Sequence, residues 1–195
     1  MKEPLSIGEM RRRAPLHYWA KADNARFSAA LLAKASPEVR SRTASAIHYG
    51  SSTGIAAQEA FLREAANSLE LILKAVIAQM AENARCRGEE THPVPATHNV
   101  VQLWRMAGLK KLKRYDMYRL VRTKHILAWS GRYGAPKNDS DYDKEHTEIL
   151  PYLLKAQAGS LGATKVEVIS FEDFDSLYSR AFERFSILQG EFGIP

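Results

Sequence analysis

Residues 55–87 read IAAQEAFLREAANSLELILKAVIAQMAENARCR, and they carry the longest helical pattern in the chain. Apolar side chains recur at steps of three and four residues, as at Phe61, Ala65 and Leu69, and this spacing lines one face of an α-helix. The apolar face widens in the middle of the stretch, as it does in helices covered on several sides. The pattern predicts a helix at the centre of the fold that ends at Gly88, because glycine commonly follows a helix.

The sequence on both sides of this stretch predicts further helices joined by short loops. Eight prolines leave long proline-free spans in which the apolar spacing stays helical. The expected helices cover residues 16–35, 37–49, 98–106, 112–129, 140–158 and a last helix that begins after Ser170. Thr97 is expected to cap the helix at 98–106, and only residues 165–169 alternate like a short extended segment. The fold class is therefore all-α, an up-and-down antiparallel helical bundle with extra C-terminal helices.

The composition places the chain among ordinary globular proteins. It has 195 residues, of which 45% are hydrophobic and 26% charged, and Cys86 is its one cysteine, so an intrachain disulfide is excluded. No apolar run approaches the roughly 18 residues of a membrane span, and the arginines at 11–13 lack the apolar segment of a secretory signal. We therefore expect a cytoplasmic protein with no membrane association. Phosphate-loop and metal-ligand patterns are missing, so we expect no cofactor and no metal.

Positive charge is concentrated in one segment. The formal net charge is +6, yet residues 105–124 alone carry +7, with Asp116 as their only acid. Such a concentration attracts phosphates. The expected nucleic-acid-binding residues are Lys110, Lys111, Lys113, Arg114, Arg122 and Lys124. The alternative is a solvated helix face whose charge is offset by the acidic stretch at 139–145.

Four short motifs occur in order between Trp19 and Tyr133. They are Trp19-Ala-Lys-Ala22-Asp23 followed by Phe27–Leu32, then Glu64–Ile77, then Pro95–Leu103 with Thr97-His98-Asn99, and finally Arg132-Tyr133. Their order and spacing resemble the HEPN superfamily, the helical domains named for higher eukaryotes and prokaryotes nucleotide-binding. The part of the chain after Pro136 has no counterpart in this resemblance.

The resemblance implies that residues 15–136 form a HEPN-like bundle, and it implies a set of partners. Outside the bundle, the sequence itself suggests that residues 1–14 are a flexible basic tail and that residues 137–195 are a helical extension packed on the bundle. Members are often homodimers, and they cleave RNA in toxin–antitoxin and defence systems or accompany nucleotidyltransferase-like proteins. The expected partners are thus RNA or a nucleotide, a second copy, and a protein such as an antitoxin or a nucleotidyltransferase. The imidazole of His98 would bond to a neighbouring helix.

The resemblance also suggests a catalytic pair. Catalytic members carry an arginine, four to six residues, and then a histidine; the nearest match is Arg119 with His125. Histidine suits removal of a 2′-hydroxyl proton, and arginine suits stabilisation of the charged phosphorane. However, Leu120 stands where a polar residue is usual, and positions six apart on a regular helix are rotated by about 240°. The alternative is that His125 is a half-buried packing residue.

Two hypotheses therefore remain open. In the first, the protein binds or cleaves RNA or nucleotides, as a metal-independent endoribonuclease if Arg119 and His125 are active. In the second, it is a catalytically inactive dimerisation or protein-interaction module. The amphipathic stripe from Phe171 to Leu188 must be buried in the core or against a partner, and the second hypothesis gives it to the partner.

Overall fold

The computed structural model describes residues 6–46, 52–130, 139–153 and 169–191, and within these ranges every regular element is a helix. The predicted all-α class is confirmed. None of the described helices is long and apolar enough to cross a bilayer. The extended segment expected at 165–169 lies, up to residue 168, outside the described residues.

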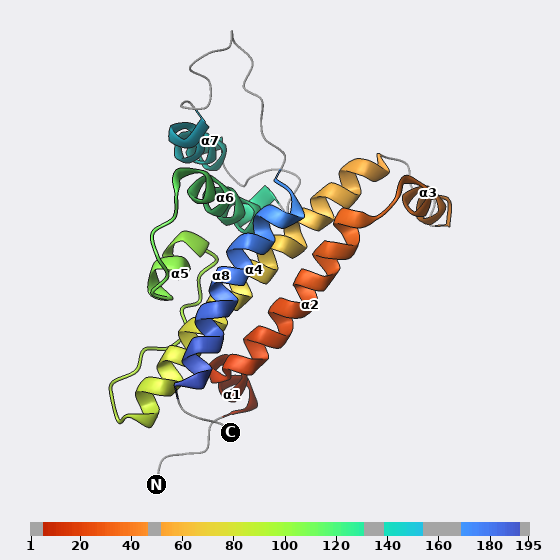
Figure 1. The fold of residues 1–195 in the computed structure, drawn as a ribbon. Helices are drawn as coiled ribbons and strands as arrows, with labels where there is room; N and C mark the ends of the chain where they lie inside the picture. Colours follow the sequence, from red (N-terminus) through yellow and green to blue (C-terminus); the bar gives the residue numbers. More distant parts are fainter. Residues whose placement is uncertain (1–5, 47–51, 131–138, 154–168, 192–195) are drawn as a thin grey trace.

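The long axis of the molecule is an antiparallel helix pair, α2 (Pro15–Lys34) and α4 (Thr53–Cys86) (Figure 1). The central position predicted for α4 is confirmed, because α4 also packs against α8 (Phe171–Gly190) and α5 (Val100–Met106). Ser52 caps α4 by accepting a hydrogen bond from the Ile55 N–H group. Gly88 ends it with a φ of +73°, a left-handed conformation that glycine adopts without strain.

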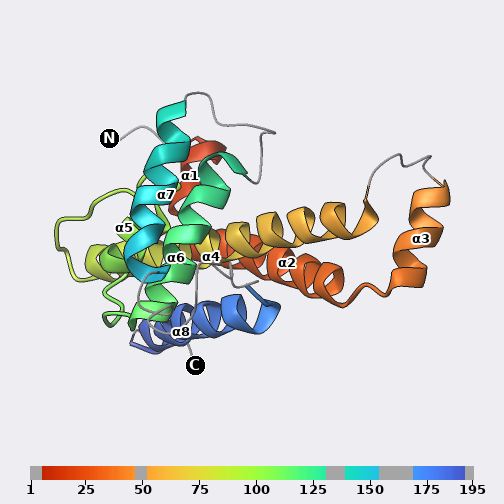
Figure 2. The same ribbon diagram turned by 90° about the horizontal axis from the view of Figure 1, so that it is seen from above.

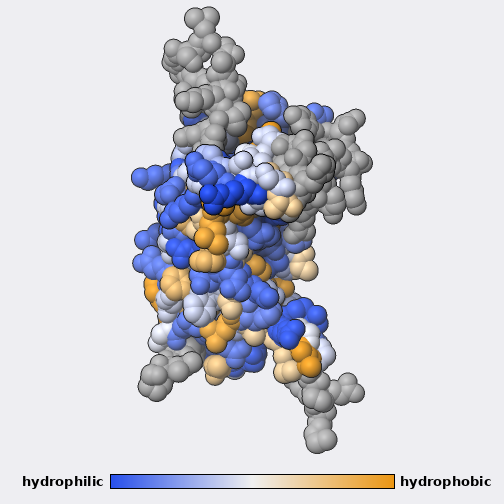
Figure 3. All heavy atoms as spheres, turned by 90° about the vertical axis from the view of Figure 1, so that its right-hand side faces the viewer, coloured by the Kyte–Doolittle hydropathy of each residue, from blue (hydrophilic) through white to orange (hydrophobic). Residues whose placement is uncertain are grey.

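The aromatic stripe of α8 belongs to the core. Phe174, Tyr178 and Phe185 are buried against the α2–α4 pair, and the Trp19 ring of α2 stacks on Phe182 with the ring centroids 6.2 Å apart. Phe182 is the most exposed aromatic residue of the stripe, at 37%. The stripe is therefore mostly buried within the fold, and it does not supply the partner surface that the second hypothesis assigned to it. The face drawn in Figure 3 shows apolar side chains scattered among hydrophilic ones.

The remaining helices differ from a simple up-and-down bundle. Figure 2 shows α6 (Arg114–His125) and α7 (Asp139–Leu153) running across the long axis, with α3 (Pro37–Ala46) at its far end. After α6 the chain continues as the π-helical turn η1 (Ile126–Ser130). The up-and-down arrangement expected from the sequence therefore applies to α2 and α4, while α8 runs in the same direction as α4 (Figure 1).

The N-terminal residues 7–13, expected as a tail, form the helix α1 (Ile7–Arg13). A capping box begins this helix, because Ser6 and Glu9 each bond to the other's backbone N–H group. The Tyr18 hydroxyl donates to the carbonyl of Arg12 at 3.2 Å and thereby ties α1 to α2.

Two expected helix boundaries are corrected. Asn99, not Thr97, caps α5, since its side chain accepts from the Gln102 N–H group. The Thr97 hydroxyl instead accepts from the Asn99 N–H group. The helix expected over 112–129 begins two residues later, at Arg114. Residues 109–113 form a non-helical connection between this helix and the glycine that ends α5. That glycine, Gly108, has a φ of +67°.

Candidate nucleic-acid interface

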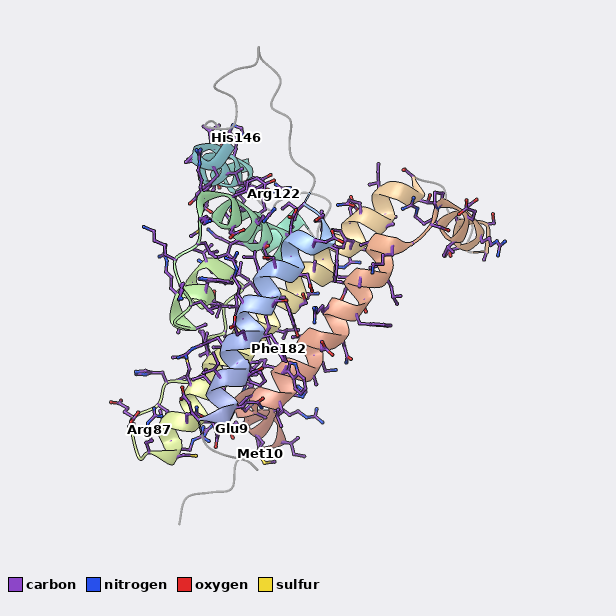
Figure 4. All side chains as sticks on the ribbon, viewed as in Figure 1. Glu9, Met10, Arg87, Arg122, His146 and Phe182 are labelled. Atoms are coloured by element: carbon purple, nitrogen blue, oxygen red, sulfur yellow. The ribbon has the colours of Figure 1, made fainter. Side chains whose placement is uncertain are left out.

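The structure divides the six expected nucleic-acid-binding residues into two groups, and the first group faces α7. Arg122 pairs with Glu145, Lys124 lies 2.6 Å from the Glu148 carboxylate, and Arg114 donates to a backbone carbonyl of α7. Figure 4 shows Arg122 where α6 meets α7. The charge offset considered from the sequence is thus present: Glu145 belongs to the acidic stretch at 139–145, and Glu148 lies just beyond it. Three of the six expected nucleic-acid-binding residues are therefore engaged within the fold.

His125 lies in this same α6–α7 contact. Its side chain is 5% exposed, and its Nε2 atom lies 2.9 Å from an oxygen of Glu148. Burial lowers the pKa of His125, although the negative charges of Glu145 and Glu148 oppose the shift. Burial acts to raise the pKa of Glu148, but the hydrogen bond and charge of Lys124 hold it below its ordinary value. The imidazole is therefore enclosed, and its burial favours the neutral form, which matches the packing alternative more closely than a catalytic base.

Arg119 points away from His125, toward α8. Its guanidinium bonds to Asp116 at 3.0 Å and to Asp173 of α8, and it lies over the Tyr115 ring at 4.2 Å. The cause is the helical rotation of about 240° over six residues. The two residues expected as a catalytic pair thus have separate partners on different faces of α6, and the structure does not bring them together.

The second group of basic residues lines an open groove. Lys110, Lys111 and Lys113 lie on the connection between α5 and α6, opposite Arg180 and Arg184 on α8. The groove has a volume of about 690 Å³. The Trp104 indole N–H donates to the Lys110 carbonyl at 3.0 Å, which fixes the connection in place. Trp104 is only 3% exposed, so its ring forms part of the core beneath the groove.

The groove is strongly positive because few acids oppose its cations. Among the described residues, the ammonium groups of Lys110, Lys111 and Lys113 make no ion pair. Arg180 pairs with Asp116 at 2.9 Å, whereas the buried Nε atom of Arg184 has no hydrogen-bond partner among the described residues. Glu183 is the only acidic residue of the lining. Such an arrangement can hold several negatively charged oxygens at once.

Sequence reasoning missed Arg180 and Arg184. Their spacing of four residues places them on one face of a helix, and this signal was available in the sequence. The packing of α8 beside the 108–113 connection was not available, because the two segments lie about 70 positions apart. The groove therefore appears only in three dimensions.

A separate polar cluster joins α4 to the connection that precedes α5. Glu70 is buried at 5% exposure, and it binds Lys74 at 2.6 Å and the Nδ1 atom of His98 at 2.9 Å. The bond from His98 to a neighbouring helix, expected from the family resemblance, is confirmed. No group of three or more His, Cys, Asp or Glu side chains in the described ranges could hold a metal ion.

Comparison of the chain with protein-family models, curated proteins and solved structures gave no match. The resemblance to the HEPN superfamily therefore stays a prediction from the motifs. Of those motifs, Arg132-Tyr133 lies outside the described residues.

Proposed function

We propose that this protein binds RNA through the groove formed by Lys110, Lys111, Lys113, Arg180 and Arg184. One observation carries the proposal: three lysines without acidic partners among the described residues share an open groove with two arginines of α8. Lysine and arginine are the side chains that neutralise backbone phosphates, and release of their counterions drives binding.

Several features favour a polyanion over a single small anion. The groove volume of about 690 Å³ exceeds what one phosphate fills, and its lysines are spread along the chain connection. Contacts made by such lysines are to the phosphate backbone and do not read the base sequence.

Trp104 is buried and offers no stacking surface for a base. The choice of RNA over DNA rests on the resemblance to the HEPN superfamily.

The proposal does not include cleavage by Arg119 and His125. A general base must lie within hydrogen-bond reach of the proton that it removes. The Nε2 atom of His125 is instead occupied by Glu148, and Arg119 is held by Asp116 and Asp173. The geometry supports a binding protein rather than a nuclease that uses this pair.

A second candidate function, protein interaction, is favoured by an apolar groove at the opposite end of the molecule. This groove of about 290 Å³ lies between α2, α3 and α4 and includes Leu32, Val39 and Ala57. Exposed Phe27, Leu31 and Ile55 stand on the same helices. Val39→Asp tests this candidate, because it should disrupt a protein contact without changing RNA binding.

The test of RNA binding uses fluorescence anisotropy with a labelled single-stranded RNA at low salt. The double variant Lys111→Gln/Lys113→Gln is compared with Lys21→Gln/Lys34→Gln, which removes the same charge from exposed positions of α2. We expect the groove variant to lose at least tenfold in affinity and the control to stay within about twofold of wild type. Equal losses in both variants, or no binding by wild type, would contradict the proposal.

A further inference from the structure

A second pocket lies where α1, the end of α4 and the connection after it meet. Its volume is about 350 Å³, and it shares no lining residue with the groove. In Figure 4, Glu9 of α1 and Arg87 after α4 mark this lower end of the molecule. The inference drawn from it therefore goes beyond the RNA-binding proposal and does not depend on it.

The pocket exists because α4 carries alanines where the connection approaches it. Ala78 and Ala81 form the wall on the α4 side, and Pro93 and Val94 of the connection add further apolar surface. On the remaining side, α1 is held by its capping box and by the Tyr18 bond to the Arg12 carbonyl. Three separate segments are thus fixed around one hollow.

The polar part of the lining is mainly cationic. Arg12, Arg13, Arg85 and His92 line the pocket, and Glu9 is its one acid. The Glu9 carboxylate is engaged by the Ser6 N–H and hydroxyl groups at 3.1 Å, and the Ser6 backbone bond lowers its pKa.

The arginines of this lining have hydrogen-bond donors that no described residue occupies. The guanidinium groups of Arg12 and Arg13 make no ion pair or hydrogen bond with any described residue. Arg85 bonds to Glu82 through one nitrogen at 2.5 Å, which leaves its other donors open. Glu82 offsets the charge of Arg85, so the guanidinium groups of Arg12 and Arg13 supply most of the attraction for an anion, and Arg85 adds its open donors.

We propose that this pocket binds the terminal phosphate of a nucleotide. A phosphate monoester carries a charge of about −1.5 to −2 at pH 7 and offers three acceptor oxygens, and guanidinium forks bind such oxygens in pairs. The phosphate contacts Arg12, Arg13 and Arg85, and the nucleoside packs on the apolar wall of Ala78, Pro93 and Val94. The same chemistry is present in a free mononucleotide and at the 5′ end of an RNA chain.

The experiment titrates the full chain with adenosine 5′-monophosphate, inorganic phosphate and adenosine by isothermal calorimetry. The double variant Arg12→Gln/Arg13→Gln is compared with Arg11→Gln, which alters the same run of arginines at a position outside the pocket lining. Ala81→Leu fills the hollow without changing a charge, and circular dichroism checks that each variant keeps its helices.

We expect the monophosphate to bind at least tenfold more tightly than adenosine. The double variant and Ala81→Leu should each lose at least tenfold, and Arg11→Gln should stay within about twofold of wild type. A further arm compares RNA carrying a 5′-phosphate with RNA carrying a 5′-hydroxyl. A preference for the phosphate that disappears in the double variant identifies the RNA end as ligand, and binding of the free monophosphate alone identifies the mononucleotide. No binding of any phosphate, or equal losses in Arg11→Gln and the double variant, overturns the proposal.

Discussion

The Nε2 atom of His125 lies 2.9 Å from Oε2 of Glu148, inside the contact between α6 and α7. The same carboxylate binds Lys124, so one glutamate of α7 holds two consecutive side chains of α6. The neighbouring pair Arg122–Glu145 makes the same helix-to-helix connection one turn away. The imidazole that the sequence offered as a catalytic base thus helps to dock α7.

His125→Ala should leave RNA binding unchanged and lower stability. The substitution removes a buried side chain and one partner of Glu148, which costs about 1–3 kcal/mol. Urea denaturation measures the loss, and anisotropy with labelled RNA measures binding. If wild type cleaves RNA and a folded His125→Ala variant does not, His125 is a catalytic residue and its role is not merely structural.

Stability should fall as the pH drops from about 7 to about 5. The pKa of His125 is lowered in the folded state, so the unfolded chain, with a histidine pKa of about 6.5, binds more protons in this range. The stability due to the neutral imidazole is complete above the unfolded pKa and is lost as the pH falls through the folded one. The lowered pKa of Glu148 acts in the same direction at lower pH.

Urea denaturation at a series of pH values measures this dependence. The variant His125→Gln should show a shallower decline, by up to about 1 kcal/mol over the range. A decline of equal steepness in the variant would assign the pH dependence to other groups.

Glu145→Gln/Glu148→Gln should raise the affinity for RNA at low salt. The two substitutions free the charges of Arg122 and Lys124, which α7 now neutralises, and added positive potential strengthens phosphate binding. We expect an increase of a few-fold, together with a stability loss of about 1–3 kcal/mol for each of these largely buried pairs.

The matched control for this variant is Glu38→Gln/Glu59→Gln, which removes two exposed carboxylates from α3 and α4. Its affinity for RNA should stay close to that of wild type. An affinity that rises equally in the control would show that net charge, not the α6–α7 contact, is responsible.

Gly88→Ala should destabilise the chain by about 1–2 kcal/mol through the backbone alone. Gly88 has a φ of +73°, and an added Cβ atom would meet nothing within 4 Å. Gly190→Ala is the control, since its Cβ atom would also meet nothing but Gly190 lies in the last turn of α8. Thermal denaturation should show a lower Tm for Gly88→Ala only; equal shifts would contradict the strain argument.

The sequence predicted helices well where local signals define both ends. The central helix, expected over 55–87, runs from Thr53 to Cys86 because Ser52 caps it and Gly88 ends it. The helix α1 was missed although Ser6 and Glu9 form a readable capping box. The run of arginines at 11–13 favoured a basic tail instead.

The sequence predicted the candidate site only in part, because charge pairing depends on packing. The lysines at 110, 111 and 113 were identified from composition alone, and the structure places them in a groove. That Arg122 and Lys124 would be neutralised depends on where α7 docks, and that Arg180 would join the lysines depends on where α8 docks. Neither contact leaves a periodic signal in the sequence.

The most direct test of the RNA-binding proposal is the dependence of RNA affinity on salt concentration. For single strands the slope of log affinity against log salt falls by about 0.7 for each phosphate contact. We expect a steep slope for wild type and a slope reduced by about 2 in the variant Lys110→Gln/Lys111→Gln/Lys113→Gln. A slope that is flat in wild type, or equal in wild type and variant, would contradict the proposal.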